Sequence, residues 1–564
     1  MPLFSRRPSA SAPFALGLAG GPARGGSPAR LIFLATFWMV ALGNWPLWEQ
    51  LARLPELANW RGVAFGLAFA VIIGGGIALL LALLAWRFTL KPALTLFLLA
   101  AAFGAYFMHT YGVVIDRSMM VNTLSTDSRE VRDLLSWRMA LVVGVLGLLP
   151  AVAVWRARLA WPGWPRQLLR NLGLALLSLA LAVGALMLVF QDFASVMRNH
   201  TQLRYLINPL NSFYALATLV WEPGKRERGP VQPLGEDARL PALPPGAKPP
   251  LVVLVLGETA RADHFALNGY PRPTTPELEK LGVASLRNVW SCGTNTAASV
   301  PCMFSPLSRG DFENRKTDTE GLADVLQRAG YAVLWIDNQA GGCKGVCQRV
   351  PTVRYHELNA PGLCSDGECF DEVMLHGLQA RIDQLPAERR ARGVVVFMHQ
   401  MGSHGPAYYK RTPPQFKRFM PECASNALQQ CGRQEVVNAF DNTILYTDHF
   451  LASVIGWLQQ HEDHWAPAMS YASDHGESLG ENGLYLHGLP YGIAPDEQKR
   501  PAWITWLSPG FQAETGITTA CVQAKQDEEF SHDNYFHSML GLLGVQTRVH
   551  EAPLDIFASC RKPG

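Results

Sequence analysis

The sequence predicts two parts: an α-helical membrane domain with five transmembrane helices, followed by an exported α/β domain. Three observations indicate this division of the 564 residues. Five apolar stretches before residue 191 are each long enough for a hydrocarbon core about 30 Å thick. All ten cysteines lie between Cys292 and Cys560. Up to Trp221 the chain has 18 basic and 7 acidic residues, a formal net charge of +11. After Trp221 it has 31 basic and 39 acidic residues, a net charge of −8.

The overall composition excludes two other classes of protein. Hydrophobic residues make up 49% of the chain and charged residues only 17%, so most of it can bury a core rather than stay disordered. The net charge of the whole chain is only +3, and Lys and Arg are not massed in one patch. A strongly basic nucleic-acid binder is therefore not expected.

The five apolar stretches are interpreted as transmembrane spans. They cover residues 31–48, 63–86, 92–114, 139–154 and 172–190, and the fourth is the shortest. The alternative of buried helices in a soluble protein would require five such helices in a row. A cleaved signal peptide does not fit either, because four further apolar stretches follow the first.

Basic residues in the loops predict the orientation of the spans. Three segments contain Arg or Lys but no acidic residue. They are the segment before the first span, the loop between the second and third spans, and the loop between the fourth and fifth spans. The other two loops mix both signs of charge. By the positive-inside rule, the N-terminus is cytoplasmic and everything after Phe190 is exported. Disulfides form on that side of the membrane, which agrees with the position of the cysteines.

Two segments join the predicted domains. Residues 191–221 mix aromatic, basic and apolar side chains and are expected either to lie along the membrane surface or to pack as an ordinary helix. Residues 222–250 contain eight prolines among charges and glycines, which is typical of an extended, semi-rigid linker. The predicted organisation is a membrane domain over 1–190, a connector and linker over 191–250, and an exported domain over 251–564.

Short apolar runs alternate with amphipathic ones in the exported domain. Strands are expected at residues 251–256, 331–336, 393–398, 468–472 and 502–507. Helices are expected at residues 275–281, 320–329, 436–460 and 535–543. This alternation predicts a largely parallel sheet with helices on both faces. Ligands of such sheets bind beyond the carboxyl ends of the strands.

Carboxylates and imidazoles follow these strands. They are Glu258, Asp337, His399, His404, Asp474, His475 and Glu477. A single acidic residue or histidine at a strand end is usually a turn or capping residue, but several at successive strands favour a metal site. Oxygen and nitrogen ligands together suit a divalent ion, and zinc fits best.

Small hydroxyl residues lie between Cys292 and Cys302, in the segment SCGTNTAASVPC. A disulfide there would hold a short loop and the start of a helix rigid. A threonine at a helix N-terminus is ordinarily an N-cap. Beside a metal ion, however, its hydroxyl can lose its proton and attack phosphorus, while the exposed backbone amides hold the phosphate oxygens.

Five motifs carry a family resemblance: VLVLGETARADHFALNGY, SCGTNTAASVPCMFS, GCKGVC, HQMGSHGPAYYKR and SDHGESLGENGLYLHG. In this order they closely resemble the phosphoethanolamine transferases of Gram-negative envelopes, which belong to the alkaline phosphatase and sulfatase superfamily. The best-known members modify lipid A and cause polymyxin resistance. The resemblance covers nearly the whole chain, but it is less specific to the acceptor. It implies an alkaline phosphatase/sulfatase-like fold for the exported domain.

The resemblance also implies roles for individual residues. The family's zinc ligands correspond to Glu258, Thr296, Asp474 and His475. Thr296 also matches the nucleophile that carries phosphoethanolamine covalently. The groups that bind the phosphoryl group or a second zinc ion correspond to His404, His487 and Lys344. One zinc ion is expected to bind firmly.

A second set of polar residues lies in the loop after the third span. Asn122, Thr126 and Glu130 are four residues apart and would share one helical face. Without the resemblance, a solvated face of a surface helix explains them equally well. In the family this loop helps to hold the ethanolamine headgroup of the donor lipid, and a carboxylate suits an ammonium group electrostatically.

The cysteines can form disulfides or bind metal as thiolates. An oxidising compartment and short separations in sequence favour disulfides. The predicted pairs are Cys292–Cys302, Cys343–Cys347, Cys364–Cys369, Cys423–Cys431 and, by elimination, Cys521–Cys560. Among the other histidines, His264, His376, His532 and His550 are interpreted as surface or packing residues and His399 as a group behind the site.

The predicted reaction is a two-step transfer of phosphoethanolamine from phosphatidylethanolamine to lipid A through a phosphoethanolamine-threonine intermediate. The protein is expected to be a monomer in the bacterial inner membrane, with its catalytic domain in the periplasm. Three alternatives compete: a hydrolase with the same zinc site, a transferase that modifies the lipopolysaccharide core or periplasmic glucans, and a non-enzymatic membrane receptor with a degenerate site. The receptor predicts missing ligands, whereas every expected ligand is present.

Overall fold

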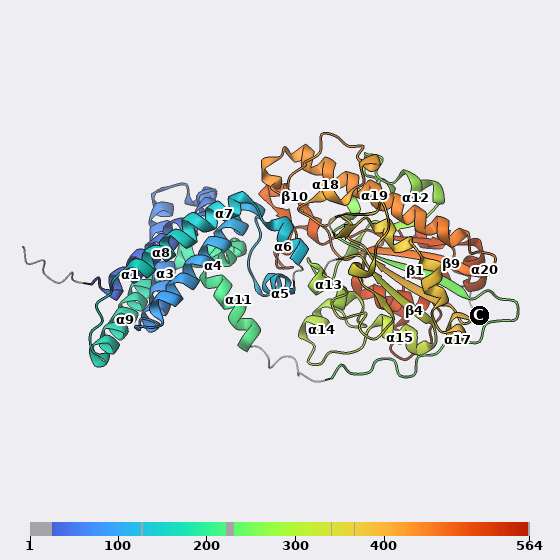
Figure 1. Cartoon of the computed structure of the whole chain (residues 1–564), viewed down its shortest axis with the longest axis horizontal. Helices are drawn as coiled ribbons and strands as arrows, with labels where there is room; N and C mark the ends of the chain where they lie inside the picture. Colours follow the sequence, from blue (N-terminus) through green and yellow to red (C-terminus); the bar gives the residue numbers. More distant parts are fainter. Residues whose placement is uncertain (1–24, 126–127, 222–229, 340, 366, 562–564) are drawn as a thin grey trace, which may run out of the picture.

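The computed structural model describes residues 25–125, 128–221, 230–339, 341–365 and 367–561. A group of apolar helices forms one end of the molecule, and an α/β domain built around a central sheet forms the other (Figure 1). The fold class predicted from the sequence is confirmed. The predicted domain boundaries stay a prediction.

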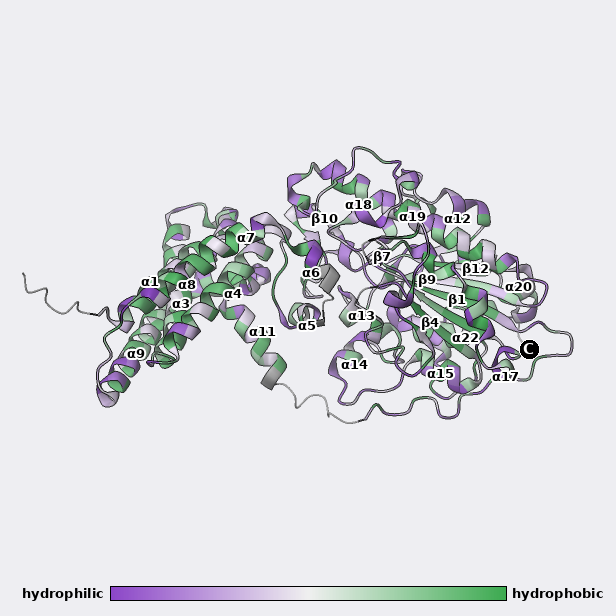
Figure 2. Cartoon of the chain, viewed as in Figure 1, coloured by the Kyte–Doolittle hydropathy of each residue, from purple (hydrophilic) through white to green (hydrophobic). Residues whose placement is uncertain are grey.

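Among the described residues, four helical segments are long and apolar enough to cross a membrane. They are α3 (Trp60–Leu83), α4 (Leu90–Tyr111), the continuous run Trp137–Arg156 and α9 (Trp164–Leu188). The run consists of α7 (Trp137–Val143), the π-helical η3 (Gly144–Leu148) and α8 (Leu149–Arg156). Leu67 and Leu176 are about two-thirds exposed, as expected for side chains that face lipid. Apolar residues cover these helices in Figure 2.

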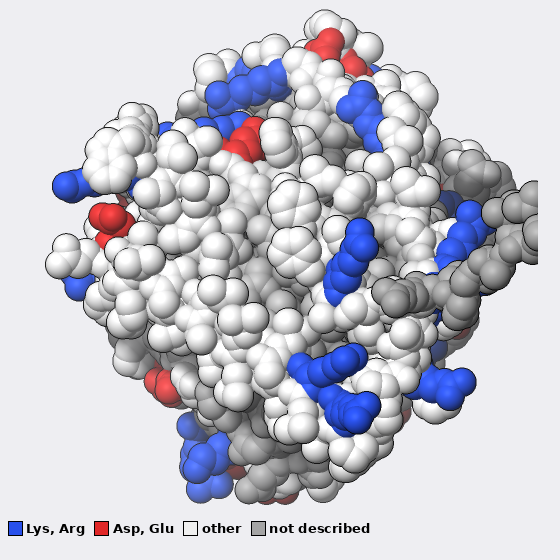
Figure 3. Space-filling view, turned by 90° about the vertical axis from the view of Figure 1, so that its left-hand side faces the viewer, with Lys and Arg blue, Asp and Glu red and all other residues white. Residues whose placement is uncertain are grey.

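The first predicted span is bent. Helix α1 (Pro28–Trp38) continues through the π-helical η1 (Met39–Gly43), and the next helix, α2 (Trp45–Ala52), departs from this direction by 50°. Pro46 in the first turn of α2 provides no amide hydrogen for a continuous helix. Counted as one span, the bent pair brings the number to five. The end of the molecule farthest from the sheet is largely uncharged, and its charges are mostly basic (Figure 3).

The connector packs into the membrane helices. It consists of α10 (Phe190–Asn199), η4 (Thr201–Leu206) and α11 (Leu210–Trp221). The Asn208 side chain donates to the carbonyls of Gly43, at 2.8 Å, and Ala101, at 2.6 Å, while Asn44 donates to the Asn208 carbonyl. Of the two alternatives for this segment, the structure therefore favours packed helices. Residues 230–249 then run without helix over the α/β domain.

The α/β domain contains a seven-stranded sheet. In spatial order its strands are β2 (Ala284–Leu286), β12 (Trp503–Leu507), β9 (Ala466–Ser473), β1 (Pro250–Gly257), β8 (Val394–His399), β4 (Ala332–Asp337) and β5 (Thr352–Val353). Neighbours from β9 to β5 are parallel, and β12 is antiparallel to both its neighbours. All five predicted strands are confirmed. The sheet gains the short edge strands β2 and β5.

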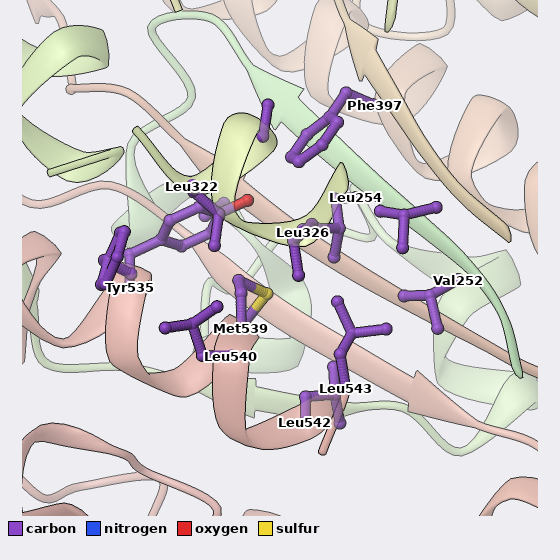
Figure 4. Close-up of a cluster of buried hydrophobic side chains, with 14 of the residues drawn as sticks. Val252, Leu254, Leu322, Leu326, Phe397, Tyr535, Met539, Leu540, Leu542 and Leu543 are labelled. Atoms are coloured by element: carbon purple, nitrogen blue, oxygen red, sulfur yellow. The ribbon is translucent and has the colours of Figure 1, made fainter. Parts of the chain in front are cut away.

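Both faces of the sheet are covered by helices. Val252 and Leu254 of β1 pack against α15 (Leu322–Ala329) and α22 (Tyr535–Leu542) in one apolar cluster (Figure 4). The intervening residue Val253 belongs to the opposite cluster with α12 (Pro276–Leu281) and α19 (Arg433–Gln459). This alternation is the period-two pattern of a strand that is buried on both faces. The four helices predicted for this domain are confirmed.

Short elements complete the domain. The helices are α13 (Thr296–Met303), α14 (Arg309–Asn314), α16 (Leu378–Asp383), α17 (Ala387–Arg390), α18 (Tyr408–Arg411), α20 (Pro509–Thr515) and α21 (Thr519–Gln523). The strands are β3 (Val289–Trp290), β6 (Cys364–Ser365), β7 (Glu368–Cys369), β10 (Ser478–Leu479), β11 (Tyr485–Leu486) and β13 (Phe530–Ser531). The ten cysteines form the five predicted disulfides.

Replacing Phe397 with alanine should destabilise the α/β domain strongly. The Phe397 ring is fully buried, 5.2 Å from the Trp335 ring and 5.5 Å from the Phe304 ring. The cavity left by Phe397→Ala should lower the free energy of unfolding by about 3–5 kcal/mol. Denaturant unfolding of the detergent-solubilised protein measures this. The control Val231→Ala, at a side chain 41% exposed, should change it by less than about 0.5 kcal/mol. Equal effects of the two variants would contradict the assigned core.

Candidate active site and metal centre

The candidate site lies at the carboxyl ends of the parallel strands. Glu258 follows β1, and Asp474 and His475 follow the neighbouring strand β9. Because Gly257 is paired with Ser473 in the sheet, the residues directly after them emerge side by side. All three side chains are completely buried. The register of two strands therefore brings together residues that are far apart in sequence.

Thr296 lies against this group. Its Oγ1 atom is 3.2 Å from Oε1 and 3.1 Å from Oε2 of Glu258. Thr296 is the first residue of α13, and the side chain of Asn295 caps this helix by accepting a hydrogen bond from the Ala298 amide at 3.0 Å. This arrangement places the hydroxyl at a helix N-terminus, where exposed amides favour an anion.

The predicted zinc ligands converge. His475 Nε2 lies 3.4 Å from Glu258 Oε1 and 3.3 Å from Asp474 Oδ2. The structure adds His487 to this group, since ligand atoms of Glu258, His475 and His487 all lie within 4.8 Å of one another. These three side chains could hold a metal ion. Which residues bind the ion stays a prediction.

The remaining predicted residues surround the group. The His487 ring is 4.4 Å from the His475 ring and 5.8 Å from the His404 ring. Burial lowers the pKa of His404 well below its ordinary value, and the charges of neighbouring groups, including Lys344, add to this effect. Lys344 therefore lies within electrostatic reach of His404. Its backbone has a φ of 48°, within the loop closed by Cys343 and Cys347.

The electrostatics of the group suit a cation. Burial and the nearby Asp474 raise the pKa of Glu258 to about 8, and burial raises the pKa of Asp474 to about 7. Burial lowers the pKa values of His475 and His487 to about 4, which keeps both imidazoles neutral. Among the described residues, Asp474 Oδ2 and His475 Nε2 are buried without a hydrogen bond. Two carboxyl groups and neutral imidazoles are the donor set of a divalent metal site.

Two further residues support the site. The Gln339 side chain donates to Glu258 Oε2 at 3.0 Å. Glu477 Oε2 lies 3.4 Å from His487 Nδ1 and so can orient that ring. Glu477 belongs to the predicted run of polar residues after β9, although no separate role was predicted for it. Gln339 shows no comparable signal in the sequence.

His532 lies behind the segment of the candidate nucleophile. Of the two alternatives expected for it, a surface or a packing residue, the structure favours packing, since His532 is buried. Its two ring nitrogens also make specific contacts. Nδ1 accepts a hydrogen bond from the Cys292 amide at 3.2 Å, and Nε2 lies 3.0 Å from the Ser473 carbonyl. Because burial lowers the pKa of His532 to about 3, the ring stays neutral and can donate from Nε2 while it accepts at Nδ1. His399, expected behind the site, lies 3.2 Å from Asp337.

The residues predicted to hold the donor headgroup are described in part. Asn122 lies on α5 (Arg117–Ser125), and the backbone of Glu130 lies in α6 (Ser128–Leu134). Thr126 lies outside the described residues. Helix α5 lies against α13, the helix that begins with Thr296 (Figure 1). The segment is therefore beside the candidate nucleophile, while its role in headgroup binding stays a prediction.

Comparison with known proteins defines first the class and then the family. The sequence model of the sulfatase family matches residues 250–545, which places the α/β domain in the alkaline phosphatase and sulfatase superfamily. A second family model, described as phosphoethanolamine transferase EptA/EptB, matches residues 75–222. The protein thus combines a sulfatase-like α/β domain with a membrane part of the type found in phosphoethanolamine transferases.

Full-length relatives identify the family. Phosphoethanolamine transferase EptA of Salmonella typhimurium is 41% identical over 94% of this chain and 96% of its own length. Phosphatidylethanolamine transferase Mcr-1 of Escherichia coli is 38% identical over 92% of this chain and 95% of its own length. The structure of lipooligosaccharide phosphoethanolamine transferase A (EptA) from Neisseria meningitidis matches with a TM-score of 0.89 at 35% identity, covering 96% of this chain and all of that one. The chain belongs to the phosphoethanolamine transferase family.

Metal binding to this site should release protons. At pH 6 the carboxyl groups of Glu258 and Asp474 hold protons, since their pKa values are about 8 and 7, and a bound cation must displace them. The affinity of the metal-free protein for Zn²⁺ should therefore rise between pH 6 and pH 8, by about tenfold per pH unit for each displaced proton. Calorimetric titration in two buffers of different ionisation enthalpy measures the protons released. A pH-independent affinity would show that these carboxyl groups do not bind the ion.

Proposed function

We propose that this protein transfers phosphoethanolamine from phosphatidylethanolamine to lipid A and thereby confers polymyxin resistance. The names of two relatives, phosphoethanolamine transferase EptA and phosphatidylethanolamine transferase Mcr-1, support the transferred group and the donor. The name of the Neisseria meningitidis protein, lipooligosaccharide phosphoethanolamine transferase A, supports a glycolipid acceptor. The observation that carries the proposal is the position of Thr296, whose hydroxyl lies 3.1 Å from Glu258 within the buried carboxyl and imidazole group. A membrane domain suits this activity because both substrates are lipids.

Zinc is the proposed metal, held by Glu258, Thr296, Asp474 and His475. When bound, it would lower the pKa of the Thr296 hydroxyl and neutralise negative charge on the phosphoryl oxygens. His404 and His487, whose rings are 5.8 Å apart, are proposed to bind the phosphoryl group or a second zinc ion. The mixture of oxygen and nitrogen donors supports zinc over Mg²⁺ or Ca²⁺, which prefer oxygen alone.

The proposed reaction has two steps. In the first, Thr296 Oγ1 attacks phosphorus and the bond from phosphorus to the diacylglycerol oxygen breaks, so the hydroxyl proton ends on diacylglycerol. In the second, a phosphate or hydroxyl oxygen of lipid A attacks the phosphorus of the phosphoethanolamine-threonine intermediate, the bond from phosphorus to Thr296 Oγ1 breaks, and the proton of the acceptor group ends on Oγ1. The Glu258 carboxylate orients the Thr296 hydroxyl by accepting its hydrogen bond. Lys344 supplies positive charge close to the phosphoryl oxygens.

Other parts of the chain support delivery of the substrates. The ethanolamine group of the donor is proposed to lie against Asn122, Thr126 and Glu130, with the carboxylate facing the ammonium. The basic loops support insertion in the bacterial inner membrane with the catalytic domain in the periplasm. We propose that the chain acts as a monomer.

Transfer to the lipopolysaccharide core or to periplasmic glucans, and hydrolysis by the same site, are the competing reactions. These reactions share their first step with transfer to lipid A, so only the final product distinguishes them. Modified core sugar or glucan would identify a different acceptor, and free phosphoethanolamine without a modified glycolipid would identify a hydrolase.

Thr296→Ala should abolish the activity. Lipid A from cells that produce the natural protein should gain the mass of a phosphoethanolamine group, and Thr296→Ala should reduce this product by roughly 10³-fold or more, because the variant lacks the attacking oxygen. Mass spectrometry of lipid A, core and glucans from the same cells measures it. The matched variant Thr296→Ser keeps a hydroxyl and should retain part of the activity. Unchanged lipid A modification by Thr296→Ala would refute the covalent step.

A further inference from the structure

Asp133 is a buried carboxylate on the membrane side of the molecule. It lies on α6, in the loop between two spans, yet it is only 5% exposed. Its carboxylate meets two cations of the α/β domain, with Lys410 Nζ at 2.5 Å and Arg411 Nη2 at 2.8 Å. The Asn426 side chain also donates to the Asp133 carbonyl. Asp133 thus binds the catalytic domain through both its side chain and its backbone.

Arg411 continues this connection into the active site. Its guanidinium is buried and makes three contacts: with Asp133, with Glu368 at 2.9 Å and, through Nε, with the backbone carbonyl of His404 at 3.2 Å. His404 is one of the residues proposed to bind the phosphoryl group. One rigid guanidinium therefore joins α6 directly to the backbone of an active-site histidine.

The same loop touches the site at two further places. Helix α5 lies against α13, which begins with the nucleophile Thr296. A Cβ atom at Gly488, next to His487, would lie 2.7 Å from the Met119 Cε atom of α5, so Met119 lies directly on that glycine. The loop that is proposed to hold the donor headgroup thus contacts the segments of Thr296, His404 and His487.

Apolar and charged contacts together join this loop to the catalytic domain. Leu134 of α6 and Met119 of α5 pack in one apolar cluster with Tyr485 and Leu486. On the side of Asp133, a cavity of about 650 Å³ adjoins the contact, and Asp133, Lys410 and Arg411 belong to its lining. There the contacts are charged and hydrogen-bonded. Removing one partner of such a buried ion pair leaves the opposite charge uncompensated.

We propose that Asp133 is a positioning residue, which aligns the donor lipid headgroup with Thr296 by fixing α5 and α6 to the catalytic domain. This inference rests on the proposed function. It assigns a purpose to the Asp133 contacts with Lys410 and Arg411: they hold the membrane-side half of the donor site in register with the half built on the sheet. A misalignment of about 1 Å between reacting groups can lower a rate by about 100-fold.

The two steps of the reaction should respond differently. Loading of Thr296 requires the membrane-side loop to align a separate donor lipid with the hydroxyl, whereas in discharge the phosphoethanolamine group is already attached covalently to Thr296 and needs no such alignment. In the full-length protein in nanodiscs that contain phosphatidylethanolamine, Asp133→Asn should slow the release of diacylglycerol by between about 10- and 100-fold. The rate at which the loaded enzyme discharges to lipid A should stay within about twofold of the natural protein.

Two variants complete the test. Lys410→Gln keeps the Arg411–Asp133 contact, so it should slow loading by a smaller factor and tests the inference even where Asp133→Asn does not fold. The control Glu422→Gln removes another ion pair of the catalytic domain, the Lys417–Glu422 pair at 2.6 Å, and should load at the natural rate.

The possible outcomes separate this inference from the proposed function. Normal loading by Asp133→Asn and Lys410→Gln, or an equal loss in loading and discharge, would overturn the positioning role alone. If the natural protein released no diacylglycerol from phosphatidylethanolamine, the proposed function would fail, and the positioning role with it. Slow loading with normal discharge in the variants, and a normal control, would support the inference.

Discussion

Two carboxyl groups, Glu258 and Asp474, lie side by side at the ends of adjacent strands, where no water reaches them. Desolvation and mutual repulsion raise the pKa of Glu258, and desolvation raises that of Asp474, because the interior disfavours two neighbouring negative charges. The surrounding imidazoles of His475 and His487 stay neutral and cannot balance them. A bound cation would allow both carboxyl groups to ionise. The register of β1 and β9 therefore creates a buried carboxyl pair that could hold a cation.

Other features of the molecule position Thr296, the proposed nucleophile, at this site. Thr296 lies at the start of α13, within the segment that is closed by the Cys292–Cys302 disulfide and contacted by His532 through the Cys292 amide. The segment that carries His487 contacts both parts of the molecule. His487 lies in the candidate site, and Leu489 packs in the same apolar cluster as the membrane helices. The candidate site thus lies where the catalytic domain meets the membrane part, which suits a reaction between lipids.

The fold and the centre of the site could be predicted because their signals are local. Apolar runs such as 251–256 indicate strands, and the polar residues directly after them must gather at one edge of a parallel sheet. The packing of the connector against the membrane helices could not be decided from the sequence, because it depends on the long-range contact of Asn44 with Asn208. The contacts of Gln339 and His532 escaped prediction for the same reason. Each is a single polar residue whose role arises only when distant segments meet.

The most direct test of this account is X-ray absorption spectroscopy at the zinc edge of the purified, full-length protein. The account predicts a first shell of oxygen and nitrogen atoms only, at about 2.0–2.2 Å, and no sulfur, because all ten cysteines form disulfides away from the carboxyl pair. Asp474→Asn should remove or rearrange this shell. A sulfur ligand at about 2.3 Å, or a spectrum that the variant leaves unchanged, would contradict the account.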